Sequence, residues 1–122
     1  MADPAASARQ VWIVGGQHGS EHPALWFADG FVRALLRQSR LPAGRCFHVV
    51  PVANPGGMRN GHLRTNPQGR DPNRHWSPAE AVTCPGVATP RGALDRHGVD
   101  LLVDVHADFE MGFVYLDVLD AW

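Results

Sequence analysis

The sequence contains no lysine, only two cysteines and no long apolar run. All 11 basic residues are arginine, which we interpret as a coding bias, and 12 acidic residues bring the formal net charge to −1. A chain without an excess of basic residues is not expected to bind nucleic acid. No apolar stretch approaches the roughly 20 residues that cross a bilayer, so we expect no association with membranes.

The two cysteines, Cys46 and Cys84, stand in unrelated contexts and do not form a Cys-x-x-Cys pair. This spacing predicts neither a zinc knuckle nor a disulfide framework. Residues 1–10 lack the basic start and apolar stretch of a secretory signal, so we interpret them as an N-terminal extension. A reducing, cytoplasmic location is the expectation that follows.

Turn-forming residues are abundant instead, with 13 glycines and 10 prolines among 122 residues. The usual combined share of glycine and proline is about 12%, so this excess indicates a loop-rich protein. Hydrophobic residues make up 44% of the chain. A chain of this length buries enough surface for one core, and we therefore expect one domain.

Short apolar runs predict the strands of a sheet. They are rich in β-branched residues and lack strict alternation, as is typical of strands buried in a parallel sheet. We expect strands at 11–14, 47–53, 101–106 and 113–119. The fold class predicted is α/β, with a mixed, largely parallel sheet and flanking helices.

Helices are expected at 24–38, where apolar residues share one face, and around 91–97. The intervening stretch 58–90 is polar, rich in glycine and proline, and without hydrophobic periodicity. A loop this long within a compact domain is usually functional or disordered.

Polar residues follow the predicted strands at the point where each strand ends. His18, Asn54 and His106 all occupy such positions. The carboxyl ends of parallel strands share one edge of a sheet, and ligands of open α/β folds bind there. We therefore expect these three side chains to converge on one site.

His18 and Glu21 are three residues apart at the junction of a loop and a helix. That spacing brings both side chains to one side of a tight turn, and His106 is the natural third member of a His2Glu set, which catalytic zinc commonly uses. The alternative is a helix-capping glutamate beside an unrelated histidine.

Four ordered segments carry a family resemblance: residues 15–21, 51–57, 64–76 and 100–106. In their order and spacing the chain resembles the M14 zinc metallocarboxypeptidases, particularly the cytosolic-carboxypeptidase-like branch. The resemblance implies a zinc carboxypeptidase-like fold and one bound Zn²⁺ ion, with His18, Glu21 and His106 as its ligands.

The resemblance also implies roles for residues between the strands. Arg64 matches the arginine that polarises the scissile carbonyl, a task suited to a fixed positive charge. Asn73 and Arg74 match the pair that grips the terminal carboxylate of the substrate, which an arginine can engage with two hydrogen bonds. Asp71 matches an aspartate that supports the first zinc histidine.

Two further residues have a predicted position without an implied role. Asp104 precedes His106 by two residues and so shares its face of the strand. It either supports that ligand or has a purely structural hydrogen bond. Trp76 is expected to anchor the loop on the core.

The general base and the closing tyrosine of the family lie far beyond the third ligand. Only 16 residues follow His106, and Glu110 and Tyr115 do not match those positions. We therefore interpret residues 11–122 as the N-terminal part of a catalytic domain, apparently truncated at the C-terminus.

Three functions remain open on the sequence. The first is a zinc-dependent carboxypeptidase that removes C-terminal residues from peptides, with its general base missing. The second is an N-acyl amino-acid deacylase or desuccinylase, which would take a small carboxylate substrate. The third is a non-catalytic, truncated zinc-binding fragment. An uncovered sheet edge also predicts self-association.

Overall fold

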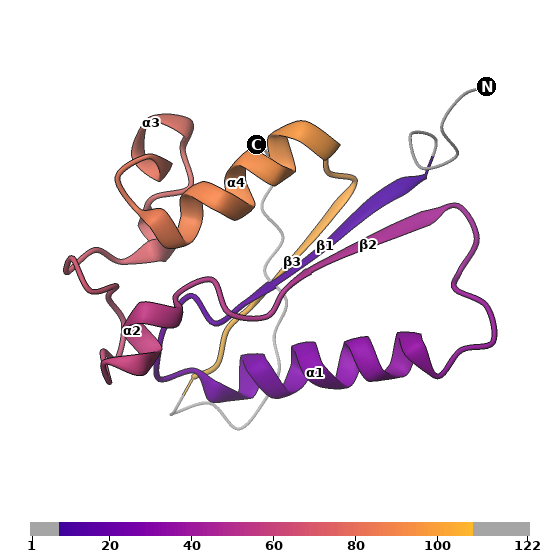
Figure 1. Ribbon diagram of the computed structural model, residues 1–122, viewed down its shortest axis with the longest axis horizontal. Coiled ribbons are helices and arrows are strands. Elements are labelled where there is room, and N and C mark those ends of the chain that lie inside the picture. The colour runs from indigo at the N-terminus through magenta and orange to yellow at the C-terminus, as the bar shows by residue number, and fades with distance from the viewer. Residues whose placement is uncertain (1–7, 109–122) are drawn as a thin grey trace.

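The computed structural model describes residues 8–108, which form three strands and five short or medium helices (Figure 1). Residues 113–119, Glu110 and Tyr115 lie outside the described part. In chain order the elements are β1 (Arg9–Gly15), α1 (His22–Leu36), β2 (Arg45–Val50), α2 (Pro55–Arg59), the 3₁₀ helix η1 (Pro72–Arg74), α3 (Pro78–Ala81), α4 (Pro85–His97) and β3 (Leu101–Val105).

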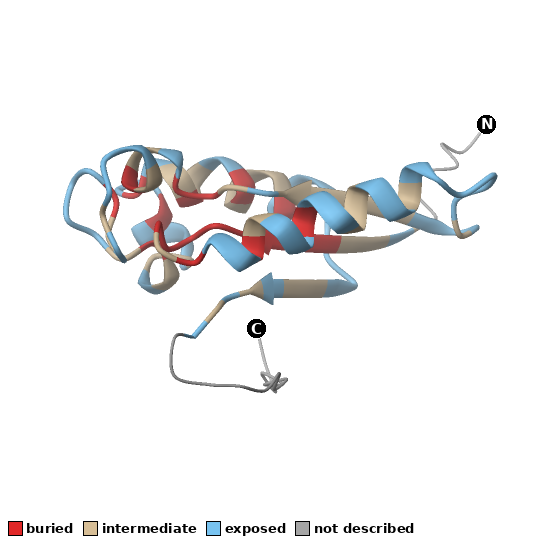
Figure 2. Ribbon diagram, turned by 90° about the horizontal axis from the view of Figure 1, so that it is seen from below, coloured by how far each residue is buried: buried red, intermediate tan, exposed pale blue. Residues whose placement is uncertain are grey.

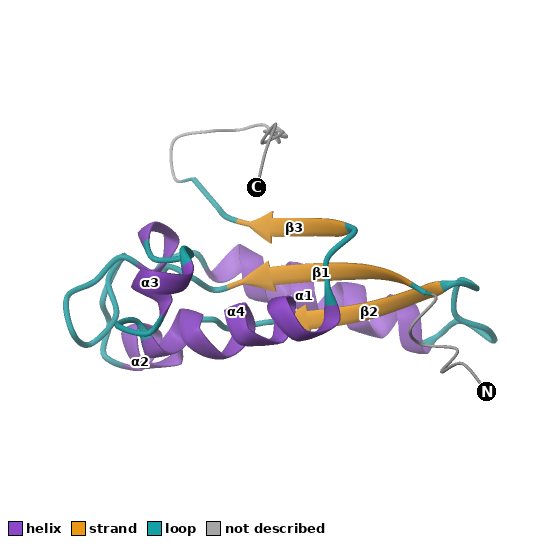
Figure 3. Ribbon diagram, turned by 90° about the horizontal axis from the view of Figure 1, so that it is seen from above, coloured by secondary structure: helices purple, strands orange, loops and turns teal. Residues whose placement is uncertain are grey.

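The sheet has the strand order β2-β1-β3, and both pairings are parallel. Val11 of β1 lies opposite Phe47 on one side and Leu101 on the other. Helix α1 covers one face of the sheet and α4 the other (Figure 1), and all three strands run toward the end of the molecule that carries α2 and α3 (Figure 3). The α/β prediction with parallel strands is confirmed.

The core is centred on β1, the middle strand. Trp12, Ile13 and Val14 are each at most 3% exposed. Small residues on α1, Ala24 and Ala28, are fully buried and let the helix approach the strand closely. Burial on both faces explains why the β1 sequence is continuously apolar rather than alternating.

Strand β3 differs from the expectation of a buried strand. Leu101 is 53% exposed, and in the described part of the chain β3 pairs only with β1 (Figure 2). Beside it, an open groove of about 470 Å³ is lined by residues of α1 and of all three strands. Its lining is almost wholly apolar and includes Ile13, Phe27, Phe31, Phe47, Leu101 and Val103. An apolar sequence shows that a strand is suited to burial, but it does not show whether another element covers that strand.

The polar stretch 58–90 is more ordered than its composition suggests, because it contains η1, α3 and the start of α4. Helix α4 begins at Pro85, six residues before the expected start, and Pro90 lies inside it. Proline costs a helix one hydrogen bond, but Pro90 is buried in its packing. No helix among residues 8–108 combines the length and apolarity needed to cross a membrane.

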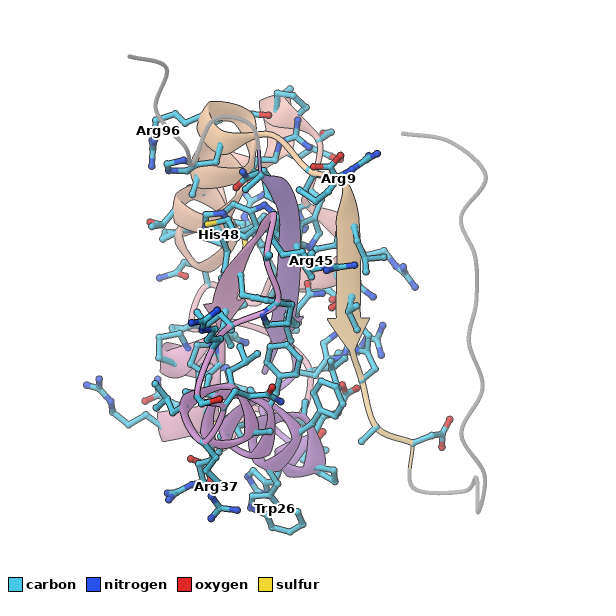
Figure 4. All side chains as sticks on the ribbon, turned by 90° about the vertical axis from the view of Figure 1, so that its right-hand side faces the viewer. Arg9, Trp26, Arg37, Arg45, His48 and Arg96 are labelled. Atoms are coloured by element: carbon cyan, nitrogen blue, oxygen red, sulfur yellow. The ribbon has the colours of Figure 1, made fainter. Side chains whose placement is uncertain are left out.

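The two helical faces present different side chains (Figure 4). Trp26 projects from α1 away from the sheet and is 72% exposed. On the α4 side, the Trp12 ring stacks on His48 with ring centroids 4.0 Å apart. The Trp12 indole also donates to the Gly98 carbonyl oxygen over 2.9 Å, which ties the end of α4 to the sheet.

Candidate metal centre

The loop after β1 places the first two candidate ligands. Gly16 adopts φ = 63°, a left-handed conformation that favours glycine. At Gly19 a side chain would run into the His62 carbonyl oxygen, so the loop can pass there only as glycine. Between these glycines the chain turns tightly, and the Glu21 amide donates to the His18 carbonyl oxygen over 3.2 Å. This turn brings His18 and Glu21 to the same side.

His106, which directly follows β3, completes the group. The Glu21 carboxylate lies between the two imidazoles, with Oε1 2.7 Å from His18 Nδ1 and Oε2 2.9 Å from His106 Nδ1. Ligand atoms of the three residues all lie within 4.8 Å of one another. Of the three side chains expected to converge at the strand ends, His18 and His106 do so, with ring centroids 5.0 Å apart.

The outer nitrogens of both imidazoles face aspartates. His18 Nε2 lies 3.0 Å from Asp71 Oδ1, and His106 Nε2 lies 2.9 Å from Asp104 Oδ2. Each ring is thus held between the shared Glu21 carboxylate and an aspartate of its own. A second-nitrogen hydrogen bond of this kind orients histidines that bind metals.

Asp71 also organises the predicted substrate-binding segment. Its Oδ2 accepts from Arg64 Nε over 2.7 Å, and its Oδ1 accepts from the Asn73 backbone amide over 2.9 Å as the N-cap of η1. One carboxylate thereby connects His18, Arg64 and the start of η1. Arg74 lies in η1, exposed to solvent, and within residues 8–108 it has no ion-pair partner.

Sequence reasoning missed Gln17, which is 1% exposed. Its Nε2 donates to both Asp104 oxygens, over 2.8 and 2.7 Å, and its Oε1 accepts from the Trp76 indole over 2.8 Å. Trp76 also packs against the cluster of Ala81, Cys84 and Val87, as expected of a loop anchor. The position of Gln17 next to His18 was the one sequence feature that could have indicated its role. No sequence feature indicated its hydrogen bond with Trp76, which lies 59 residues away.

Asn54, expected at the same edge, has a structural role. Its amide nitrogen donates to the Gln17 and Thr65 carbonyl oxygens, both over 3.1 Å, and its Oδ1 accepts from the Gly57 amide. Asn54 therefore ties the loop that carries His18 to the loop that carries Arg64. It stands at the strand end but is already fully engaged by backbone groups.

The contacts fix the charge of the site. Burial acts to raise the pKa of Glu21, but hydrogen bonds from His106 and His18 outweigh it and hold that pKa at about 2. Hydrogen bonds to Asp104 and Glu21 raise the pKa of His106 to about 10, against the effect of burial. Burial likewise opposes ionisation of Asp71, yet hydrogen bonds from His18 and Arg64 lower its pKa. The carboxylates are therefore ionised at neutral pH, as metal ligands and their supports must be.

The donor set fits zinc. Two imidazoles and a carboxylate form one of the standard three-residue sets of catalytic zinc, which leave a further coordination position open. The Nδ1 atoms already face a common carboxylate, and both outer nitrogens are anchored. His18, Glu21 and His106 could therefore bind the ion with little rearrangement.

Comparisons with known proteins point to one family. The family model described as zinc carboxypeptidase matches residues 3–93. An uncharacterised protein of Zymomonas mobilis is 36% identical over 88% of this chain and 30% of its own length. Human cytosolic carboxypeptidase 6 is 28% identical over 94% of this chain and 25% of its own.

Solved structures show the same relationship. A metallo-carboxypeptidase from Pseudomonas aeruginosa, in complex with (2-guanidinoethylmercapto)succinic acid, superposes with a TM-score of 0.79 at 38% identity, covering 86% of this chain and 29% of that one. The metallo-carboxypeptidase of Burkholderia cenocepacia gives 0.76 at 34% identity, covering 85% and 30%. The chain thus spans less than a third of the length of these relatives. On its sequence and its fold, the chain belongs to the zinc carboxypeptidase family.

Proposed function

We propose that this chain binds one zinc ion through His18, Glu21 and His106, and that it contributes this centre to a zinc carboxypeptidase that removes C-terminal residues from peptides. The observation that carries the proposal is the convergence of the three ligands, with an aspartate behind each histidine. Zinc bound there supplies Lewis acidity for hydrolysis of an amide bond.

The substrate-binding roles rest on the segment between Arg64 and Arg74. The bond of Arg64 to Asp71 uses Nε, and its side chain is 52% exposed, so the terminal nitrogens can face a substrate oxygen. In this proposal Arg64 stabilises negative charge that develops on the carbonyl oxygen. Asn73 and Arg74 hold the free carboxylate of the peptide, a geometry to which the guanidinium of Arg74 is suited.

Related support comes from the ligand of the Pseudomonas structure, a succinic acid derivative and hence a carboxylate. A free carboxylate is common to C-terminal peptides and N-acyl amino acids. The named relatives are carboxypeptidases, and we therefore favour peptides as substrates. The cytosolic carboxypeptidases among them also support a cytoplasmic location for this protein.

Zinc content decides the ligand assignment. We expect about one zinc per chain by elemental analysis after dialysis. His18→Ala and His106→Ala should each lose tightly bound metal, because a three-residue site retains only two ligands. His22→Ala is the matched control, since His22 lies exposed beside Glu21. Stoichiometric zinc in the His106→Ala chain would refute the assignment.

Substrate class is tested separately. The zinc-loaded chain, and a longer relative as reference, are assayed on peptides with free C-termini and on N-acyl amino acids. Release of single C-terminal residues by the relative, abolished by Arg64→Gln at the matching position, supports the peptidase. Preferential cleavage of N-acyl amino acids favours the deacylase, and zinc binding without hydrolysis by this chain identifies it as a binding fragment.

We also propose that two copies of the chain associate through the outer edge of β3, a strand that within residues 8–108 pairs only with β1. Asp104 is the one charged residue of β3, and its carboxylate is engaged by Gln17 and His106, so this edge carries little of the charge that commonly protects against pairing. Two β3 strands related by a two-fold axis would close both edges at once and cover the exposed Leu101. Light scattering after size-exclusion chromatography should show a dimer that Val103→Lys converts to a monomer; a concentration-independent monomer refutes self-association.

A further inference from the structure

The two aspartates that contact the histidines differ in what the sequence predicts for them. Asp71 is part of the segment to which the family resemblance gives a role. Asp104 has no implied role, yet its Oδ2 lies 2.9 Å from His106 Nε2, as close as Asp71 lies to His18. We propose that Asp104 is the positioning residue of the third zinc ligand, and that Gln17 and Trp76 hold it in place. This inference rests on the zinc site proposed above.

The geometry of β3 makes the contact possible. Residues two apart in a strand project from the same face, so Asp104 and the His106 ring lie on the same side of the chain. His106 follows the last residue of β3 and its side chain is 31% exposed. A half-exposed imidazole beyond a strand end needs a partner to select one ring orientation, and Asp104 is that partner.

Gln17 fixes Asp104 from the buried side. It lies in the loop between β1 and α1, and its Nε2 donates to both oxygens of the Asp104 carboxylate. The carboxylate therefore has little freedom to turn away from His106. Since Gln17 directly precedes His18, the support of the third ligand and the first ligand share one loop.

Trp76 determines which way the Gln17 amide points. An indole N–H can only donate, so the atom facing it over 2.8 Å must be the amide oxygen of Gln17. The amide N–H₂ is then directed at Asp104, and the carboxylate accepts from it. The remaining acceptor capacity of Asp104 faces His106 Nε2, which must carry a proton to donate.

The direction of the whole chain of hydrogen bonds follows from that one indole. It runs from Trp76 through Gln17 to Asp104, and from His106 Nε2 to the same carboxylate. In the neutral ring, the form that binds a metal, a proton on Nε2 leaves Nδ1 as the nitrogen with a lone pair, and Nδ1 is the atom that faces Glu21. The four side chains thus select the nitrogen through which His106 binds metal.

The test compares zinc affinity in four chains by competition with a chromophoric chelator. Asp104→Asn should weaken zinc binding by about 10–100-fold, the usual effect of losing such a partner. Trp76→Phe keeps the aromatic packing but releases the amide orientation, and should weaken binding by a smaller factor. Asp29→Asn makes the same charge change on α1, where Asp29 pairs with Arg33. It should leave zinc affinity within about twofold of wild type, because this ion pair lies within one helix, away from the hydrogen-bond chain and from β3.

A spectroscopic measurement keeps the proposal testable if the Asp104 variant does not fold. In the zinc-loaded wild-type chain, long-range proton–nitrogen NMR correlations should show His106 protonated at Nε2 and zinc-bound through Nδ1. If Asp104 had a purely structural role, the Asp104→Asn substitution would lower the thermal stability of the metal-free chain without changing its zinc affinity.

Three outcomes separate the proposals. Equal zinc affinity of the Asp104→Asn and Asp29→Asn chains overturns the positioning role, as does zinc bound through His106 Nε2 in the wild type. Both of these leave the zinc site itself intact. Absence of zinc binding by the wild-type chain overturns the proposed function and this inference together.

Discussion

The two histidines of the metal centre are supported very differently. His18 is 2% exposed and lies in the turn between the central strand β1 and helix α1. His106 has a side chain 31% exposed and follows β3, which in the described residues pairs on one side only. The first half of the site is thus built into the core, whereas the second half depends on the position of an edge strand. We therefore expect formation of the whole site to be limited by the docking of β3.

The largest effect should come from breaking the buried half. In Gly19→Ala the added methyl group would meet the His62 carbonyl oxygen and lie 3.1 Å from the Met58 amide nitrogen. Neither backbone group can move without displacing the loop, so we expect a loss of about 3 kcal/mol in unfolding free energy and no tight zinc binding. Urea denaturation and zinc titration measure the two effects.

Gly30→Ala is the matched control for that experiment. Gly30 lies within α1, and nothing would contact its added methyl group within 4 Å. Alanine in an exposed helix interior should increase stability by about 0.5–1 kcal/mol and leave zinc affinity unchanged. A Gly19→Ala chain that matched Gly30→Ala in both measurements would contradict the tight approach at the loop.

A smaller change compares the two aspartates directly. Asp71→Asn should weaken zinc binding more than Asp104→Asn, within the range of about 10–100-fold. The Asp71 side chain is 19% exposed and its loss also leaves Arg64 without its ion pair, whereas Asp104 is 33% exposed. Isothermal titration of both single variants and the double variant gives the comparison. If Asp104→Asn lost more zinc affinity than Asp71→Asn, the contact between Asp104 and His106, rather than the docking of β3, would limit the affinity of the site.

Local patterns predicted the three described strands and α1. The apolar run around Trp12 and the Gly15-Gly16 pair placed β1, and strand ends followed by polar residues placed the site. The sequence could not place the edge of the sheet, because Leu101 is apolar in a strand whether or not another strand covers it. It also understated α4, since Pro90 interrupts the pattern while its burial lets the helix continue.

The sequence predicted the candidate ligands and the support of His18 by Asp71, and left the role of Asp104 open, but it did not predict the residues that hold Asp104. Spacing and family resemblance reach His18, Glu21 and His106, because the residues that bind a metal are constrained in type. Gln17 and Trp76 are constrained by each other, through a bond between residues 59 positions apart. Such a pair has no local pattern, so only the folded structure reveals it.

The smallest expected effect concerns His48, which contacts the end of α4 just before the start of β3. Burial, and the neighbouring His97 ring 5.3 Å away, lower the pKa of His48 below its ordinary value of 6.5. Its other close neighbours are Trp12 and the Gln10 carboxamide, whose oxygen lies 2.7 Å from Nε2. Burial and His97 favour the neutral ring, and the contact with His97 holds the end of α4, which leads into β3.

The sign of the pH effect follows from that lowered pKa. Near pH 6.5 the unfolded chain takes up a proton at His48 more readily than the folded chain, so stability falls as the pH drops through 6.5 and levels off below the folded pKa. Because His48 and His97 are partly exposed and their interaction is screened by solvent, we expect the unfolding free energy to change by less than about 1 kcal/mol. Thermal unfolding of the wild-type and His48→Gln chains from pH 7.5 to 5 isolates this contribution, since both carry the same metal ligands and carboxylates. If the stability difference between the two chains stayed constant over this range, His48 would support α4 by packing alone. Protonation of His48 would then not weaken the half of the site that contains His106.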